Sequence, residues 1–254
     1  MMQLAVLFLI PFFGTALGSS CVLFLRNGLS LKAEKIVTGF ASGVMLAALV
    51  WSLLLPAIET STYFHAAFGF ILGIGFLLAL DRLVPHQHAT EENPEGRKSE
   101  NLTRVSLLLL SVTIHNIPEG MAVGAGAAAL TGTGVTVSYA SALALSLGIA
   151  LQNFPEGMVV SFPLYKAGKS KLRAFWEGLL SGAVEPLGSV IAYVFARHVG
   201  AVLPVFLSFA AGAMFYVVVE ELIPEASEGE HSDLGTIGAA AGFVAMMLLD
   251  GIFS

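Results

Sequence analysis

His115-Asn-Ile-Pro-Glu119-Gly and Gln152-Asn-Phe-Pro-Glu156-Gly are two copies of one short pattern. Each copy lies inside an apolar stretch that is long enough to cross a membrane as a helix. An ionisable residue at the centre of such a helix costs about 3 kcal/mol on insertion scales. Two apolar stretches each keep a Glu four residues after a polar side chain. This pattern predicts that these polar side chains serve a function inside a membrane bundle.

The composition places the whole chain in a membrane. Of its 254 residues, 56% are hydrophobic and only 12% are charged, whereas about a quarter of the residues in a soluble domain are charged. Twelve basic residues against eighteen acidic ones exclude a basic surface for nucleic acid and are consistent with the handling of cations. The single cysteine, Cys21, excludes an intramolecular disulfide, a multi-cysteine zinc site and an iron–sulfur cluster.

Eight apolar segments are long enough to span about 30 Å of hydrocarbon. They predict an all-α integral membrane protein with a single transmembrane domain over residues 1–254. The first segment lacks the basic start of a signal peptide and stays apolar to Leu25, so we interpret it as a transmembrane helix. The polar connection at 85–101 has the composition of a flexible cytoplasmic loop. The predicted helices are 3–25, 36–58, 64–83, 105–130, 138–164, 175–196, 201–223 and 235–253.

The basic residues predict the orientation of the chain, because cytoplasmic loops are enriched in Lys and Arg. Eleven of the twelve basic residues lie in or beside three connections on one side of the predicted bundle, and only Arg197 falls on the other side. The connections after helices 1, 3 and 5 are therefore predicted to be cytoplasmic, and both termini to be outside. The eleven residues are Arg26, Lys32, Lys35, Arg82, Arg97, Lys98, Arg104, Lys166, Lys169, Lys171 and Arg173.

The two motif copies predict a shared metal site. Residues i and i+4 share a helix face, so His115 lies beside Glu119, and Gln152 lies beside Glu156. The proline of each copy frees a backbone carbonyl one turn earlier. A short connection makes the two helices antiparallel neighbours, so that the four side chains converge. Imidazole together with carboxylate and amide oxygens favours a borderline ion such as Zn²⁺ or Fe²⁺ over Ca²⁺ or Mg²⁺.

Further residues at membrane depth extend this candidate site. Glu185 is followed by Pro in the middle of the sixth predicted helix, and we assign it to the metal site as a third intramembrane carboxylate. Met45 offers a thioether, although a methionine in a helix usually packs in the core. The pairs Gly69–Gly73 and Gly178–Gly182 favour close helix contact, with a sliding surface between moving parts as the alternative.

Three pairs of polar residues are candidates for access or release of the metal, and each has a second interpretation. The pair at the outer face is equally compatible with an interfacial position. The pair in the cytoplasmic loop is also compatible with an ordinary polar loop, and the pair near the end of helix 7 is also compatible with solvated helix-end charges. Asp250 is interpreted as a solvated helix end. The three pairs are Glu59 with His65 at the outer face, His86 with His88 in the cytoplasmic loop, and Glu220 with Glu221 near the cytoplasmic end of helix 7.

The chain resembles the ZIP family of divalent metal transporters, and most of all its prokaryotic GufA-type branch. The resemblance rests on HNIPEG at 115–120, QNFPEG at 152–157 and EPLG at 185–188. It implies a 3+2+3 arrangement of helices in which the outer triplets form an inverted repeat. It also implies a bacterial inner-membrane location and alternating access, by an elevator-like movement of the metal-carrying helices.

The resemblance further implies a binuclear metal site. The residues implied for the first metal are Met45, His115, Glu119, Gln152 and Glu156. Those implied for the second are Asn116, Asn153 and Glu185, with Glu119 and Glu156 shared as bridges. Many relatives have His in place of Gln152, and some have Asp in place of Asn153. The Asn in place of Asp makes the site less anionic, which predicts a weaker second metal position.

The predicted function is transport of divalent ions into the cytoplasm, with Zn²⁺ as the main substrate and Fe²⁺, Mn²⁺ or Cd²⁺ as others. The metal is then a substrate and no cofactor is expected. A metal-selective channel is the alternative that the sequence does not separate from a carrier. An intramembrane di-metal hydrolase is disfavoured, because neither HExxH nor a Ser–His–Asp arrangement is present. The expected partners are metal ions and the lipid bilayer, with a homodimer as one candidate assembly.

Overall fold

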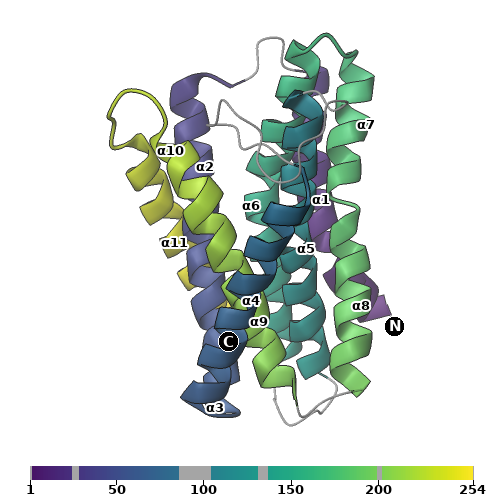
Figure 1. Cartoon of the computed structure of the whole chain (residues 1–254), viewed down its shortest axis with the longest axis vertical. Coiled ribbons are helices and arrows are strands. Elements are labelled where there is room, and N and C mark those ends of the chain that lie inside the picture. The colour runs from purple at the N-terminus through teal and green to yellow at the C-terminus, as the bar shows by residue number, and fades with distance from the viewer. Residues whose placement is uncertain (1, 25–28, 86–103, 131–136, 199–201, 254) are drawn as a thin grey trace.

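The computed structural model describes residues 2–24, 29–85, 104–130, 137–198 and 202–253, without the side chains of 104–105. Within these ranges all regular elements are helices, and eight spans are long and apolar enough to cross a membrane. The predicted all-α membrane fold is thereby confirmed (Figure 1). The elements are α1 (Met2–Phe24); α2 (Leu31–Ala48), η1 (Leu49–Leu54) and α3 (Leu55–Glu59); α4 (Tyr63–Leu83); α5 (Arg104–Ala129); α6 (Tyr139–Lys166); α7 (Lys171–Ser181) and α8 (Val184–His198); α9 (Leu203–Val217), η3 (Val218–Leu222) and α10 (Ile223–Ser227); and α11 (Leu234–Phe253).

The second span begins at Leu31, one turn before the start that was predicted at 36. Ser30 caps this turn, because its hydroxyl accepts a hydrogen bond from the Ala33 N–H at 3.3 Å. Lys35, which was predicted to lie in a loop, is a buried helical residue whose ammonium donates to the Glu230 carbonyl at 2.7 Å. The prediction was wrong here because a buried Lys is rare unless a distant part of the chain supplies its partner.

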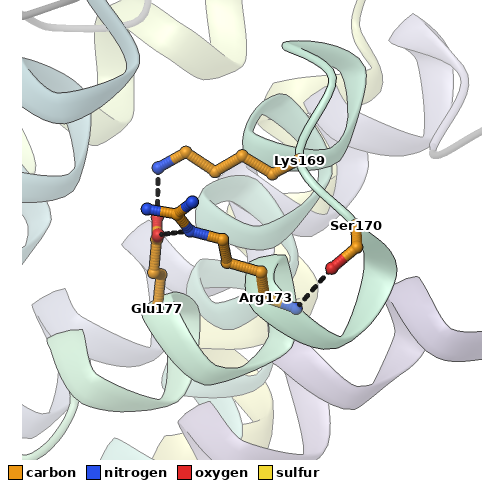
Figure 2. Close-up of polar contacts among 4 residues, drawn as sticks. All are labelled: Lys169, Ser170, Arg173 and Glu177. Atoms are coloured by element: carbon orange, nitrogen blue, oxygen red, sulfur yellow. Dashed lines mark hydrogen bonds and ion pairs between the residues drawn. The ribbon is translucent and has the colours of Figure 1, made fainter.

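The sixth span also begins earlier than its predicted start at 175. Ser170 caps α7 by accepting from the Arg173 N–H at 3.3 Å, and Arg173 Nε donates to Glu177 Oε1 at 2.9 Å. Lys169 pairs with the same carboxylate, as Figure 2 shows. Exposed ion pairs of this kind contribute about 0–1 kcal/mol each. The cluster therefore fixes where α7 starts more than it stabilises the fold.

Two spans contain a π-helical segment immediately before a proline. The segment η1 precedes Pro56, and η3 precedes Pro224. A proline has no amide hydrogen and its ring collides with the carbonyl four residues earlier. A wider turn relieves that collision, and such turns are frequent at functional sites. In η3 the wider turn leaves Glu220 exposed and Glu221 buried inside the bundle.

The sixth span is broken in its middle, which the sequence analysis did not predict. Helix α7 ends at Ser181, and α8 begins at Val184 with Glu185 in its first turn. The Ser181 carbonyl at the break accepts a hydrogen bond from Asn116 Nδ2 of α5 at 3.0 Å. A broken membrane helix exposes backbone groups that must find partners inside the protein. Here Asn116 of the first motif copy is the partner of one such backbone group.

Glycines join the helices in four close pairs. A methyl group at Gly14 of α1 would overlap the backbone of α6, and one at Gly120 of α5 would overlap that of α8. In the same way Gly43 of α2 fits against α11, and Gly73 of α4 fits against α9. Small residues of this kind let membrane helices approach each other closely. The pairs α1–α6, α5–α8, α2–α11 and α4–α9 are thus held backbone to backbone.

These pairs follow the 3+2+3 order of the chain. An inverted repeat relates spans 1, 2 and 3 to spans 6, 7 and 8, and span 4 to span 5. This relation converts the pair α1–α6 into α8–α5, and the pair α2–α11 into α9–α4. The sequence carries the same relation, since Phe40-Ala-Ser-Gly-Val-Met45 in α2 matches Phe209-Ala-Ala-Gly-Ala-Met214 in α9. Both termini lie toward the end of the bundle that holds α3, away from the α10–α11 connection (Figure 1).

The pairs form two groups of helices. We call α1, α5, α6 and α7–α8 the motif group, because it holds both motif copies and Glu185, and we call α2–α3, α4, α9–α10 and α11 the second group. The groups meet mainly along α2–α6 and α5–α9. Among the described glycines, only Gly148 of α6 would collide across this seam if it had a Cβ, and it would meet the Met246 side chain rather than backbone. Glycine contacts therefore interlock backbones within the groups but not between them.

Candidate metal centre

The two motif copies meet in the core of the bundle. Both α5 and α6 continue through their motif prolines. His115, Glu119 and Gln152 are buried, and Gln152 Nε2 donates a hydrogen bond to Glu119 Oε1 at 2.8 Å. Because this bond links one copy to the other, the predicted convergence of the two helices is present in the structure.

Glu185 reaches the same region from the break in the sixth span. Its side chain is fully buried, and its Oε1 accepts a hydrogen bond from Thr15 Oγ1 of α1 at 2.8 Å. Gly182 leaves the space for this arrangement, since a Cβ there would stand 2.9 Å from both the Thr15 methyl and Glu185 Oε1. The broken helix, the glycine and the threonine together fix the direction of this carboxylate.

Three carboxylates of the motif group interact electrostatically with one another. Glu119 interacts electrostatically with Glu185, and Glu156 interacts with both of them. The Asn153 amide faces Glu119 and Glu185 but forms no hydrogen bond of good geometry. In the described part of the chain no Lys or Arg is among the groups that interact with these three carboxylates. The described side chains therefore supply no cationic partner for these carboxylates, and a bound metal ion would be such a partner.

Four buried acceptor oxygens at this place have no hydrogen-bond donor among the described residues. A buried polar atom without a partner costs about 1–3 kcal/mol. Carboxylate and amide oxygens have lone pairs that a divalent cation satisfies as a ligand. The chemistry of the donor set therefore fits a metal ion. The four atoms are Asn116 Oδ1, Glu119 Oε2, Gln152 Oε1 and Glu185 Oε2.

Charged ligands alone do not form a metal cage here. Among the described residues, no three His, Cys, Asp or Glu side chains are gathered closely enough to hold an ion by themselves. A site must therefore include neutral ligands, and the amides of Gln152 and the two motif asparagines are the buried candidates beside the carboxylates. Met45 is also fully buried, in the core cluster that contains Ile114 next to His115.

An inner cavity opens beside the motifs toward the end of the bundle with α10. His115 and Glu156 line it from the motif group, and Glu221 and Glu225 line it from the second group. Glu221 Oε2 contacts His115 Nδ1, and Ser111 Oγ donates to Glu221 Oε1 at 3.5 Å. Of the two predicted release residues, Glu221 thus lies at the site, whereas Glu220 points out of the bundle.

An outer pocket lies at the opposite end, near α3. Glu59 and Asp250 line it together with serines of η1 and α6. Asp250, which was interpreted as a solvated helix end, accepts a hydrogen bond from Ser52 Oγ at 3.0 Å. His65 does not line this pocket, and its Nδ1 lies 2.9 Å from Thr62 Oγ1 at the start of α4. His86 and His88 lie outside the described residues.

Several residues around the site were not found from the sequence. Thr15 contacts Glu185 across 170 positions of the chain, so no local pattern connects them. Glu225 lies beyond the predicted end of the seventh helix at 223, yet it is buried and lines the inner cavity. The signal that could have identified both is the same one that identified Glu185, a polar residue in or beside an apolar span.

Comparisons with known proteins agree with this geometry. A family model described as "ZIP Zinc transporter" matches residues 85–250. The chain belongs to the ZIP zinc transporter family. The matched range includes both motif copies and Glu185, while Met45 and Glu59 precede it.

Curated ZIP-family relatives match the chain along most of its length. The Homo sapiens protein named Zinc transporter ZIP11 is 36% identical, with 93% of each chain covered. Zinc transporter GufA of Myxococcus xanthus is 36% identical over 93% of this chain and 94% of the relative. Zinc transporter ZIPB of Bordetella bronchiseptica is 35% identical over 94% and 77%, respectively. The predicted resemblance to the ZIP family, GufA-type relatives included, is confirmed.

Proposed function

We propose that this ZIP-family chain carries divalent metal ions, with Zn²⁺ as the main substrate, across the membrane into the cytoplasm. The observation that carries the proposal is the set of four buried oxygens that have no donor among the described residues, together with the buried imidazole of His115. Several relatives are named zinc transporters, which supports zinc as the cargo. Fe²⁺, Mn²⁺ and Cd²⁺ are further candidate substrates, because one imidazole among oxygen ligands discriminates weakly among borderline ions.

The proposed site has two positions. The first uses Met45, His115, Glu119, Gln152 and Glu156, and the second uses Asn116, Asn153 and Glu185 with both motif glutamates shared. In the structure Gln152 Nε2 donates to Glu119, and Gln152 Oε1 has no donor among the described residues, which supports this oxygen as a ligand of the first position. Thr15 holds one oxygen of Glu185 and leaves the other available, which supports Glu185 as a ligand of the second position.

The proposed route runs from the outer pocket to the inner cavity. Ser141 of the outer pocket and Gln152 of the site are eleven residues apart on α6, a rise of about 16 Å. Buried Leu145 and Ile149 lie between them on this helix. The inner cavity, in contrast, reaches His115 directly. This asymmetry supports an arrangement in which the site communicates with the α10 end, which the basic residues assign to the cytoplasm.

Alternating access is proposed to occur by movement of the motif group against the second group. Within each group, glycines allow helices to interlock backbone to backbone, whereas the described glycine contact across the seam involves a flexible methionine. Closely interlocked helices move together, and a seam of side chains permits relative displacement. The motif group carries most of the proposed ligands, so its displacement would carry the ion.

Zn²⁺ flux into proteoliposomes that contain the purified protein tests the proposal. An internal zinc-sensitive dye should report uptake that exceeds empty vesicles and saturates with external Zn²⁺, as a carrier requires. Glu119→Gln, which keeps the shape of the side chain, should abolish uptake. Glu177→Gln, in the surface cluster of Figure 2, is the matched control and should retain it. Wild-type flux equal to that of empty vesicles would refute transport, and flux that rises linearly without saturation would favour a channel.

A further inference from the structure

The first and sixth spans carry a related five-residue pattern. Thr15-Ala-Leu-Gly-Ser19 lies in α1, and Glu185-Pro-Leu-Gly-Ser189 lies at the start of α8. Five residues are too few to reveal a relation by themselves, but the inverted repeat of the fold pairs these two spans. The pattern then aligns Thr15 with Glu185. A hydroxyl in the first half of the chain therefore takes the place that a carboxylate has in the second half.

Contacts with the two motif copies support this alignment. Ser19 Oγ donates to the Gly157 carbonyl at 3.2 Å, in the same way as Ser189 Oγ donates to the Gly120 carbonyl at 2.9 Å. Each of these glycines is the last residue of its motif copy. Each also stands against the carbonyl oxygen of the first residue of the five-residue pattern, because a Cβ on the glycine would overlap that oxygen. The first residues of the two patterns are thus equivalent in space as well as in sequence.

The two equivalent residues contact each other at the candidate metal centre. Both are buried, and Thr15 Oγ1 donates to Glu185 Oε1 at 2.8 Å. Residues that a two-fold relation exchanges can touch only close to its axis, so the centre lies where the two halves of the chain meet. A carboxylate at both positions would join Glu119 and Glu156 in a set of four. Because the first half supplies a hydroxyl instead, three carboxylates interact here.

We propose that Thr15 limits the metal centre to one tightly bound divalent ion. This inference rests on the proposed transport function and on its two metal positions. Two divalent ions carry four positive charges, whereas the three carboxylates supply three negative charges when ionised. Uncompensated charge in a buried site is costly, so the second ion binds weakly. The Thr15 hydroxyl adds no negative charge, and its hydrogen bond occupies one oxygen of Glu185.

Equilibrium dialysis of the purified full chain with Zn²⁺ measures how many ions bind and how tightly. Thr15→Asp adds a carboxylate in a similar volume and should raise the affinity for the second ion about tenfold. Thr15→Asn has the same shape without the charge, so it is the matched control and should bind one ion tightly, as the wild type should. Equal affinity for the second ion in these two variants, or two equally tight ions in the wild type, would overturn the role of Thr15. All samples carry loop substitutions that remove competing imidazoles, namely His86→Ala, His88→Ala and His231→Ala.

An exchange of the two equivalent residues tests the same idea without the Thr15→Asp protein, should that variant fail to fold. Glu185→Thr alone should weaken Zn²⁺ binding about tenfold, because the centre loses a carboxylate. Adding Thr15→Glu returns a carboxylate from the other half of the chain and should restore wild-type binding. Adding Thr15→Gln instead is the control and should not restore it. Equal binding by the two double variants would overturn the equivalence on which the proposal depends.

These measurements also separate the role of Thr15 from the transport function. Normal wild-type Zn²⁺ flux into proteoliposomes together with either negative binding result would overturn the role of Thr15 and leave transport standing. A wild-type protein that binds no Zn²⁺ and gives no flux above that of empty vesicles would refute both.

Discussion

Gln152 and His115 occupy equivalent places in the two motif copies, but they offer different ligands. The imidazole of His115 binds Zn²⁺ well, whereas an amide oxygen is a weak ligand. The Gln152 amide is also engaged with Glu119 through a 2.8 Å hydrogen bond. In the proposed site, a neutral amide oxygen in place of a second imidazole should keep the affinity for the ion moderate and its release fast.

Replacement of Gln152 by His should make the site bind more tightly and release more slowly. We expect Gln152→His to lower the Kd for Zn²⁺ about tenfold, which corresponds to about 1.4 kcal/mol. The maximal flux should fall, because the ion then leaves more slowly. Equilibrium dialysis and proteoliposome flux on the same preparation measure the two quantities. A variant with unchanged affinity would show that position 152 does not contact the ion, and Gln152→Ala serves as the control for lost volume.

Among individual residues, the motif residues were predictable from the sequence, but the residues that contact them were not. The spacing of His115, Glu119 and Glu156 within apolar spans predicted that they lie near one another, and their role as metal ligands stays a prediction. Thr15 and Thr38 are ordinary helix residues in the sequence, and only the folded chain brings them against Glu185 and into the inner cavity. Asp250 was assigned to a helix end for the same reason, because its partner Ser52 is distant in sequence.

Individual helices are shaped by a few small residues and prolines. Gly120 follows the first motif copy, and a Cβ there would overlap the backbone of α8 at Glu185. This approach brings Glu185 to the motif helix. Ser189 Oγ reinforces it by donating to the Gly120 carbonyl at 2.9 Å. The position of the third carboxylate thus depends on a glycine that has no side chain to act as a ligand.

Gly120→Ala should disturb the α5–α8 contact and with it the metal centre. Since backbone atoms cannot give way as a flexible side chain can, we expect a large loss of thermal stability and loss of Zn²⁺ flux. Gly75→Ala in α4 is the control, because a Cβ there meets nothing within 4 Å. Thermal unfolding of the purified variants, followed by fluorescence, gives the comparison. Equal stability of the two variants would contradict the glycine-locked pair.

The existence of the helices was predicted correctly, and their internal irregularities were missed. Hydropathy identified all eight spans, because a membrane helix must bury its backbone polar groups within itself. The break after Ser181 and the π segments before Pro56 and Pro224 do not alter hydropathy, so length and composition could not reveal them. The prolines were the available signal in η1 and η3, and Gly182 was the signal at the break.

The whole molecule consists of two groups of helices that meet at a seam of side chains. Contacts across the seam include Glu221 with His115 and Met246 with Gly148. This division was not predictable from the sequence, because it depends on which glycines face which helix. The inverted relation of the triplets was expected from the family resemblance, and the order of the glycine-locked pairs follows it.

A covalent link across the seam should stop transport. Gly148 and Met246 face each other across the seam, since a Cβ at 148 would stand 3.8 Å from Met246 Cγ, so we choose them for a disulfide. In a Cys21→Ser background, oxidation of Gly148→Cys combined with Met246→Cys should abolish Zn²⁺ flux, and a reductant should restore it. Each single variant treated in the same way is the control. Full flux in the cross-linked protein would exclude movement of the groups along this seam.

The most direct test of a zinc site among His115 and the buried oxygens is X-ray absorption at the zinc edge. The sample is purified protein with one equivalent of Zn²⁺ and with His86→Ala, His88→Ala and His231→Ala, so that loop imidazoles do not contribute. The account predicts a first shell dominated by oxygen at about 2.0–2.2 Å with a single imidazole nitrogen, and loss of the imidazole signal in His115→Ala. A first shell with two or more imidazoles, or a spectrum that His115→Ala leaves unchanged, would contradict it.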